Sequence, residues 1–412
     1  MNKRILIFTD SFPYGHGEAF FEPELQHLAG FFEHITILPL EKKGGVCRRG
    51  LPANVTVSEP PFNRLKSKLS LLAAGIFNLS PPGSFIREGF ASRVFFSRYR
   101  FRTWLAHLLM IRHLLSFIKK NNLSSELKSH DLLYFYWGLR WSQVLPFLPA
   151  GMVPKTIVRF HGSDLYEHTN GGYIPWRKSQ LMKIDNYLTV SETGKRYLIE
   201  TYKIAEEKIF LSRLGTIDYG INPFMESDRI RIVSCSNLVP VKRVDLLARA
   251  LRHCTRQAEW IHFGDGPCRK IVEKAASSLP SNVIFRLAGH VSHDELADFF
   301  RKNHVSLFIN VSSSEGVPVS VMEALSFGIP VIATDAGGTS EIVNDSNGRL
   351  IPVNFDPADL AEIIETFVGH GKYPEYRLNA RKSWEENCMA SKLIPAFTDF
   401  LLSVCDFLFK PR

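Results

Sequence analysis

The chain has 412 residues, of which 45% are hydrophobic and 22% are charged, and its formal net charge is +9. This composition is typical of a globular protein of about two domains, and it excludes low-complexity and collagen-like chains. The six cysteines lie at spacings that match neither a metal site nor a redox motif, so we expect reduced thiols in a cytoplasm.

The first apolar run, Ile5–Phe8, is too short for a signal peptide and is typical of a buried strand. No stretch reaches the roughly 18 apolar residues that a membrane-spanning helix needs. We therefore expect a cytoplasmic protein without a transmembrane helix.

The first half of the chain alternates short β-rich runs with segments of helical spacing. Alternation of this kind predicts a parallel sheet that helices cover on both faces. The expected strands are Arg4–Phe8, His34–Leu38, Leu132–Tyr136, Thr156–Phe160 and Asn186–Val190, and the expected helices are Phe20–Phe32 and Trp104–Lys120.

The basic residues are concentrated between Phe62 and Lys120, a segment that holds eleven of them and only one acid, Glu88. Aromatic residues are interleaved with them, among them Phe85, Phe90, Phe95, Phe96, Tyr99, Phe101, Trp104 and Phe117, as in surfaces that bind an anionic membrane or a nucleic acid. A solvated basic face over core aromatics is an equally good interpretation. The basic residues are Arg64, Lys66, Lys68, Arg87, Arg93, Arg98, Arg100, Arg102, Arg112, Lys119 and Lys120.

A short polar stretch, Asp218–Asp228, separates this half from a second one with the same alternation. We therefore predict an α/β protein of two doubly wound, Rossmann-like domains, residues 1–220 and 221–384, that face each other across a cleft. The tail from Ser383 to Leu408 is predicted to be an amphipathic helix. The expected strands of the second half are Ile230–Cys235, Trp260–Phe263, Val283–Ala288, Val305–Asn310 and Pro330–Thr334, and its helices are Val244–Arg252, Cys268–Ser278, Asp294–Arg301 and Ser320–Phe327.

The segment from Ser314 to Ala333 carries the strongest chemical signal. Glu315 follows a predicted strand, Pro318 suits the first position of a helix, and that helix is predicted to stop at Gly328. The helix N-terminus offers free N–H groups to an anion such as a diphosphate. Glu323 lies eight residues after Glu315 on the same local surface, so two carboxylates flank this anion site and suit sugar hydroxyls. A helix cap followed by a solvent-facing glutamate is the plainer alternative.

This segment resembles the E-x7-E signature of retaining glycosyltransferases of family 4, which have the two-domain GT-B fold. The resemblance implies that Glu315 binds hydroxyls of the donor sugar and that Glu323 binds the ribose of the nucleotide. It implies that the C-terminal helix, residues 385–412, returns to the N-terminal domain. Backbone groups of Gly316, Val317, Pro318, Val319 and Ser320 would hold the diphosphate and sugar.

Further segments match this family in the expected order. Gly264 lies in a turn that resembles the family's Gly-Asp-Gly-Pro motif, and His290 and Val291 lie in the loop expected beside the nucleobase. Lys242 matches the lysine that neutralises the leaving diphosphate. Asn237 stands where the family has an arginine, and Arg243 replaces a glycine, so Lys242 is expected to carry the charge with Arg243 as a second cation or as a solvent-facing helix-start residue.

The first half matches the family less closely. Gly15 and Gly17 follow the first strand and are expected near the diphosphate and acceptor. His161 belongs to a His-Gly-x-Asp segment that reaches towards the transferred sugar in the family, although a structural histidine is the alternative. Asp164 of the same segment is interpreted as a helix cap.

The resemblance implies front-side displacement with retention of the anomeric configuration. Neither a cofactor nor a metal ion is expected, and the donor is a UDP or GDP sugar that acts as substrate. The basic segment is expected to meet the inner face of the cell membrane, and the resemblance then implies a lipid-linked glycan of bacterial surface polysaccharide as the acceptor. No nucleic acid partner is expected. A GT-B sugar-nucleotide epimerase and a non-enzymatic membrane-binding protein are the alternatives.

Overall fold

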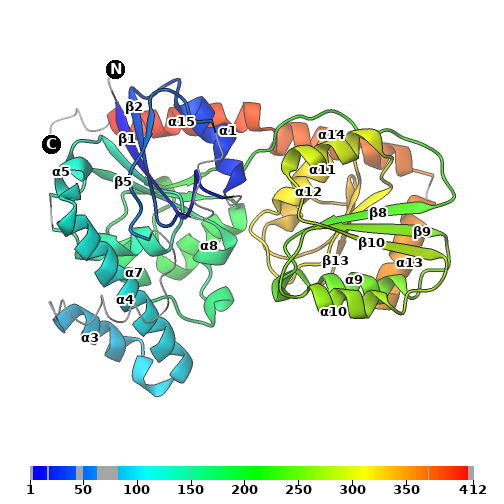
Figure 1. Ribbon diagram of the computed structural model, residues 1–412, viewed down its shortest axis with the longest axis horizontal. Coiled ribbons are helices and arrows are strands. Elements are labelled where there is room, and N and C mark those ends of the chain that lie inside the picture. The colour runs from blue at the N-terminus through cyan, green and yellow to red at the C-terminus, as the bar shows by residue number, and fades with distance from the viewer. Residues whose placement is uncertain are drawn as a thin grey trace. The chain divides into compact units, whose positions relative to one another are not determined.

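The computed structural model describes residues 3–15, 18–42, 50–62, 82–149, 151–369 and 371–406. It consists of two compact units, which are shown in Figure 1. Unit 1 comprises Met1–Val190, Gly194–Ser212 and Ile394–Arg412, and unit 2 comprises Ser191–Thr193 and Arg213–Leu393. The division falls at residue 212 and within the last helix, compared with the expected boundaries at residues 220 and 384.

Unit 1 is built on a parallel seven-stranded sheet in the order β3-β2-β1-β4-β5-β6-β7. The expected strands are present, and two short edge strands, β3 and β7, were not expected. The strands are β1 (Arg4–Thr9), β2 (His34–Pro39), β3 (Val55–Val57), β4 (Leu132–Phe135), β5 (Lys155–Phe160), β6 (Asn186–Thr189) and β7 (Ile209–Leu211), and the α-helices are α1 (Glu22–Leu28), α3 (Pro82–Ala91), α4 (Arg98–Lys120), α5 (Leu123–Lys128), α6 (Gly162–Leu165), α7 (Arg177–Leu181), α8 (Glu192–Tyr202) and α15 (Ala390–Asp406).

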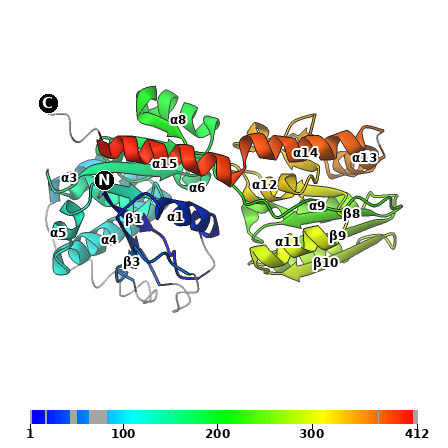
Figure 2. The same ribbon diagram turned by 90° about the horizontal axis from the view of Figure 1, so that it is seen from above.

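Helices cover both faces of this sheet because alternate residues of each strand point to opposite faces. Ile5 and Ile7 belong to a core cluster with residues of α1 and α15, whereas Leu6 and Phe8 belong to a cluster with residues of α4. Figures 1 and 2 show α15 running along unit 1 near α1. The N-terminal Lys3 fastens this helix by an ion pair of 2.6 Å to Asp406.

Unit 2 contains a parallel six-stranded sheet in the order β10-β9-β8-β11-β12-β13. Its main core cluster joins β8, β9 and β11 to α9, α10 and α13. Figure 1 shows α9 and α10 on one side of the sheet and α11 and α12 on the other. The strands are β8 (Ile230–Cys235), β9 (Ala258–Phe263), β10 (Val283–Gly289), β11 (Leu307–Asn310), β12 (Val331–Thr334) and β13 (Gly348–Ile351), and the α-helices are α9 (Val244–Leu251), α10 (Arg269–Ala276), α11 (His293–Lys302), α12 (Val319–Ser326), α13 (Pro357–Val368) and α14 (Tyr373–Asn387).

The sequence predicts one continuous C-terminal helix from Ser383, but the structure has two helices, α14 and α15, with a break at Cys388 and Met389. At the break the backbone bonds to Thr216: Thr216 N–H donates to the Cys388 carbonyl, and Ala390 N–H donates to the Thr216 carbonyl. A Cβ atom on Gly215 would lie 2.5 Å from the Cα of Ala390, so only glycine permits this approach.

None of the helices within the described ranges is long and apolar enough to cross a membrane.

A buried ion pair lies at the centre of unit 1. Arg159 of β5, which is 1% exposed, donates from Nη1 to Oε2 of Glu24 at 2.7 Å. Tyr134 also donates to Glu24, and the guanidinium lies 4.7 Å from the ring centroid of Phe397 in α15. Burial raises the pKa of Glu24, although Arg159 beside it acts in the opposite direction. The pair thus links α1, β5 and α15, and either partner alone would be a buried, uncompensated charge.

We predict that Arg159→Met destabilises unit 1 by about 3–5 kcal/mol, because Glu24 would be left buried without its cation. Urea unfolding followed by tryptophan fluorescence measures this change. Lys195→Met is the matched control, since Lys195 pairs at 2.8 Å with an exposed Glu206 and exposed pairs contribute only about 0–1 kcal/mol. Equal effects of the two substitutions would contradict the role given to the buried pair.

Candidate donor-binding site in unit 2

The candidate site lies at the carboxyl end of the unit 2 sheet, where β8 and β11 are neighbours. Leu307 and Phe308 of β11 pair in parallel with Ile232 and Val233 of β8. The chain leaves β8 towards β9 on one side and β11 leads to β12 on the other, so this is the point at which the strand order reverses. Ligands of doubly wound sheets bind at such a point, outside the strand ends.

Lys242 and Glu315 meet at this edge. Lys242 ends a 3-10 turn after β8, Pro240–Lys242, and Glu315 lies in the loop after β11. The Lys242 Nζ donates to Glu315 Oε1 at 2.6 Å, and their side chains are 24% and 10% exposed. Asn310, the last residue of β11, donates from its amide to the same oxygen at 3.2 Å. Two of the predicted site residues are therefore brought into direct contact, and Asn310 is a partner that sequence reasoning missed.

The loop that carries Glu315 is held by backbone contacts with glycines. Gly338 N–H donates to the Gly316 carbonyl at 2.6 Å. A Cβ atom on Gly337, which has a φ of 61°, would lie 1.9 Å from the Glu315 carbonyl oxygen. Only glycine fits where these two backbone segments touch. The turn after β12 therefore fixes the backbone position of Glu315 relative to the sheet.

Helix α12 begins directly after this loop with Pro318 as its N-cap residue, whereas the sequence placed Pro318 inside the first turn. The first intrahelical bonds run from Val321 and Met322 N–H to the Pro318 carbonyl. The N–H groups of Val319 and Ser320 precede these bonds and point out of the helix end, which favours an anion there.

Glu323 lies further along α12 with its side chain 16% exposed. His293, the first residue of α11, approaches Glu323 Oε1 through Nδ1 at 2.7 Å. The neighbouring His290 and Val291 were expected at the site from the sequence, but His293 was not. The only feature of the sequence that points to His293 is the Ser292–Glu295 capping box, which places it at the first helical position.

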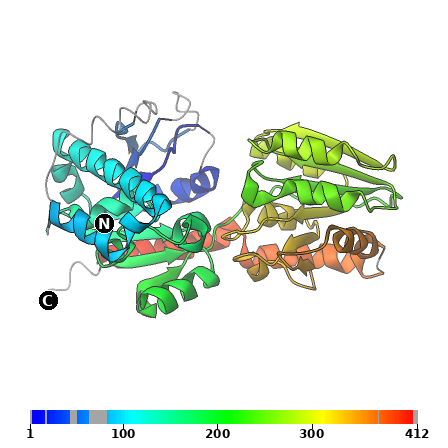
Figure 3. The same cartoon turned by 90° about the horizontal axis from the view of Figure 1, so that it is seen from below.

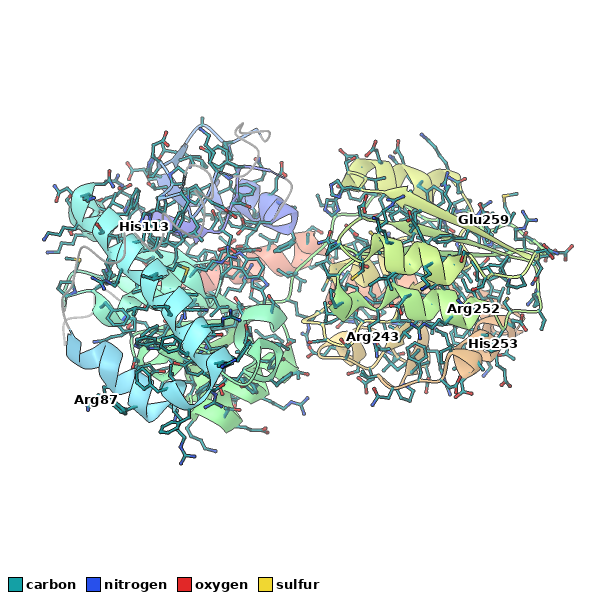
Figure 4. All side chains as sticks on the ribbon, turned by 60° about the horizontal axis from the view of Figure 1, so that its bottom comes forward. Arg87, His113, Arg243, Arg252, His253 and Glu259 are labelled. Atoms are coloured by element: carbon teal, nitrogen blue, oxygen red, sulfur yellow. The ribbon has the colours of Figure 1, made fainter. Side chains whose placement is uncertain are left out.

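Arg243, at the start of α9 (Figure 4), has its guanidinium directed to backbone carbonyls. It donates to Val311 at 2.9 Å, to Val353 at 2.8 Å and to Ser312 at 3.4 Å. These bonds fasten the start of α9 to the loop after β11 and to the segment after β13, and a role of Arg243 as a second cation for the donor stays a prediction. Asn237 is exposed, in the loop after β8.

The turn after β9 comes close to the loop after β8. Gly264 has a φ of 130°, and a Cβ atom there would lie 1.9 Å from the Ser236 carbonyl oxygen. Its N–H donates to the Gly289 carbonyl at the end of β10, which is followed by the exposed His290 and the half-buried Val291. The loops after β8, β9 and β10 thus lie side by side.

Cys235, at the end of β8, lines a small pocket together with Lys242, Asn310 and Ser312. Burial raises the pKa of its thiol to about 12, Glu323 acts in the same direction and Lys242 opposes it. The thiol is therefore neutral at physiological pH and acts here as a small packing group.

In unit 1, His161 follows β5 and is 7% exposed. Its Nε2–H donates to the Tyr136 carbonyl at 3.0 Å, and its ring lies 4.2 Å from that of Trp137. Burial lowers its pKa to about 3, and the charge of Arg159 acts in the same direction, so the ring is neutral at physiological pH. Asp164 accepts from the N–H groups of His161 and Gly138, both at 2.6 Å.

Gly15 lies in the loop after β1 with a φ of 69°, and Gly17 is outside the described residues. The residue that organises this loop is Glu18, to which sequence reasoning gave no role. Its carboxylate accepts from the N–H groups of Asp10, Ser11 and Phe12 at 2.7–3.0 Å, and from the Trp137 indole at 2.7 Å. These amides after β1 are thus occupied by a carboxylate of the chain itself.

Across the described residues, no group of three or more His, Cys, Asp or Glu side chains is arranged to hold a metal ion. The positive charge at the centre of the site is that of the Lys242 ammonium group.

The chain is similar to known proteins in sequence and in fold. The model of the family Glycosyl transferases group 1 matches residues 222–387, which lie in unit 2. The chain is 30% identical to the uncharacterized glycosyltransferase MJ1178 of Methanocaldococcus jannaschii, over 60% of this chain and 67% of that protein. It is 26% identical to the UDP-N-acetylglucosamine–peptide N-acetylglucosaminyltransferase GtfA of Streptococcus agalactiae, over 44% of this chain but only 36% of that protein.

The fold is similar to that of Anabaena Alr3699/HepE, solved in complex with UDP, with a TM-score of 0.65 and 16% identity over 97% of this chain and 100% of that one. The two parallel sheets are thus those of the GT-B fold. From the match of unit 2 and the identity to the archaeal relative, the chain belongs to the family Glycosyl transferases group 1.

Proposed function

We propose that this glycosyltransferase is a retaining enzyme that transfers a hexose from a UDP or GDP sugar to a hydroxyl group of a glycan or lipid-linked glycan. The observation that carries the proposal is the contact of Lys242 with Glu315 at the strand-order reversal of unit 2. It sets a cation for phosphate and a carboxylate for sugar hydroxyls side by side, directly before the N-terminus of α12.

Each part of the donor has a matching group at this edge. The diphosphate suits Lys242 together with the N–H groups of Val319 and Ser320. The hexose hydroxyls suit the Glu315 carboxylate, which Lys242 and Asn310 orient. The ribose hydroxyls suit Glu323, about one and a half helical turns further on.

In the proposed reaction the bond between C1 of the hexose and the diphosphate oxygen breaks while the acceptor oxygen bonds to the same face of C1. The proton of the acceptor hydroxyl passes to the departing diphosphate, whose growing negative charge Lys242 and the helix N-terminus stabilise. The anomeric configuration is retained, and Glu315 acts as a sugar ligand and not as a nucleophile.

The relatives suggest which donor to test first. HepE was solved with UDP and with UDP-glucose, and the name of the streptococcal relative gives UDP-N-acetylglucosamine as its donor. A melting-temperature screen against UDP and GDP sugars would identify the base, since a ligand at about 100 times its Kd stabilises by roughly 2.7 kcal/mol.

We predict that three substitutions show which residue binds each part of the donor. The measurement is calorimetric titration with UDP and with the UDP sugar. Lys242→Met should weaken both ligands about 10- to 100-fold, because it removes a charged hydrogen-bond donor to the diphosphate. Glu315→Gln should leave UDP binding unchanged and weaken the UDP sugar about tenfold. Glu323→Gln should weaken both ligands and also uridine.

Lys302→Met and Glu273→Gln are the matched controls, since both side chains are exposed on unit 2 and belong to i,i+4 pairs. Both controls should bind like the wild type. Loss of UDP binding in Glu315→Gln would contradict the assignment of this carboxylate to the sugar.

We further predict that the anomeric proton of the product keeps the coupling of the donor, as NMR of a reaction mixture with acceptor would show. Donor incubated alone should be recovered unchanged apart from slow hydrolysis. An inverted product would overturn the proposed retention, and an epimerised donor formed without acceptor would favour an epimerase.

A further inference from the structure

Five large aromatic side chains are exposed within a short stretch of unit 1. They belong to α3, to the 3-10 turn Val94–Phe96 and to the first turn of α4. Figures 1 and 3 show α3 beside the start of α4, on the outside of the unit. The exposed fractions are 67% for Phe90, 48% for Phe95, 87% for Phe96, 52% for Tyr99 and 40% for Phe101.

Three of these rings, Phe90, Phe95 and Phe101, belong to an aromatic cluster. Phe95 lies 5.4 Å from Phe90 and 6.3 Å from Phe101 between ring centroids. Both Phe95 and Phe101 contact the buried Trp104, at 6.0 and 6.1 Å. The buried Trp104 therefore supports Phe95 and Phe101, so this part of the apolar surface is preformed.

The same segment is cationic. Arg87, Arg93, Arg98 and Arg102 are exposed, and none forms an ion pair with another residue within the described ranges. Figure 4 shows Arg87 on the outside of α3. Arg93 has a φ of 50°, and its left-handed backbone makes the turn that leads into Phe95 and Phe96.

The one acid of the segment is directed inward. Glu88 Oε1 accepts from Ser92 Oγ at 2.8 Å, from Tyr173 O–H at 3.1 Å and from Trp176 N–H at 3.2 Å. Arg100 is also engaged internally, with the carbonyls of Ser92 and Gly172. The four exposed arginines therefore give this face its positive charge.

From this combination we propose that the surface formed by Phe90, Phe95, Phe96, Tyr99 and Phe101, with the four exposed arginines, docks onto an anionic lipid bilayer. Phenylalanine side chains enter the boundary between headgroups and acyl chains, and arginines beside them meet the lipid phosphates. A second copy of the chain does not fit, because four arginines would face four arginines.

The test is co-sedimentation of the full chain with vesicles of phosphatidylcholine alone or with about one third phosphatidylglycerol. Binding should require the anionic lipid and should weaken as salt rises, because the charges at the surface are screened. Phe96→Ser and the double variant Arg98→Ser/Arg102→Ser should each lower the partition coefficient about tenfold. The matched controls are Phe31→Ser, an exposed ring on the same unit, and Lys119→Ser/Lys120→Ser at the far end of α4.

Phe96→Trp gives an independent measurement, since its emission should shift to the blue when anionic vesicles are added. Equal binding to both vesicle types, no binding, or unchanged binding of Phe96→Ser would overturn the proposal. Oligonucleotide binding or self-association that depends on Phe96 more strongly than vesicle binding does would also overturn the proposal. Phe96→Ser should keep its UDP-sugar affinity, so a failure of the docking proposal is distinguishable from a failure of the donor site.

Discussion

The ion pair between Lys242 and Glu315 is the interaction on which the candidate site depends. Its two residues come from loops that follow neighbouring parallel strands, β8 and β11. The pair therefore links these two loops at the carboxyl end of the sheet. Lys242 and Asn310 keep the Glu315 carboxylate oriented, so the proposed donor would meet a cation and a carboxylate that are already in position. Preorganised groups of this kind contribute most to catalysis where charge develops in the transition state.

The surrounding residues support this pair through the backbone. Gly337 and Gly338 let the turn after β12 touch the carbonyls of Glu315 and Gly316, and Arg243 ties three further carbonyls to the start of α9. Substitutions at these positions would act on the donor indirectly, by shifting the loop that carries Glu315. The contact of His293 with Glu323 is of another kind, because a ribose bound to this carboxylate would have to displace or share it.

Much of this architecture could be predicted because the signals were local. Parallel strands buried on both faces are near-continuous apolar runs, as in Ile5–Phe8, and the turn between Glu315 and α12 is marked by glycine and proline. Contacts between distant segments gave no such signal. The break between α14 and α15 depends on Thr216, more than 170 residues earlier, and the role of Glu18 depends on the amides of the loop after β1. The engagement of Arg243 with carbonyls of the loop after β11 is likewise a product of the fold.

A structure of the full chain with an unhydrolysed UDP or GDP sugar would show where the donor binds. We expect hexose hydroxyls within hydrogen-bond distance of the Glu315 carboxylate, a phosphate oxygen at Lys242 Nζ and at the N-terminus of α12, and ribose hydroxyls at Glu323. A donor bound elsewhere, with the Lys242–Glu315 and His293–Glu323 contacts left as they are without ligand, would contradict this expectation.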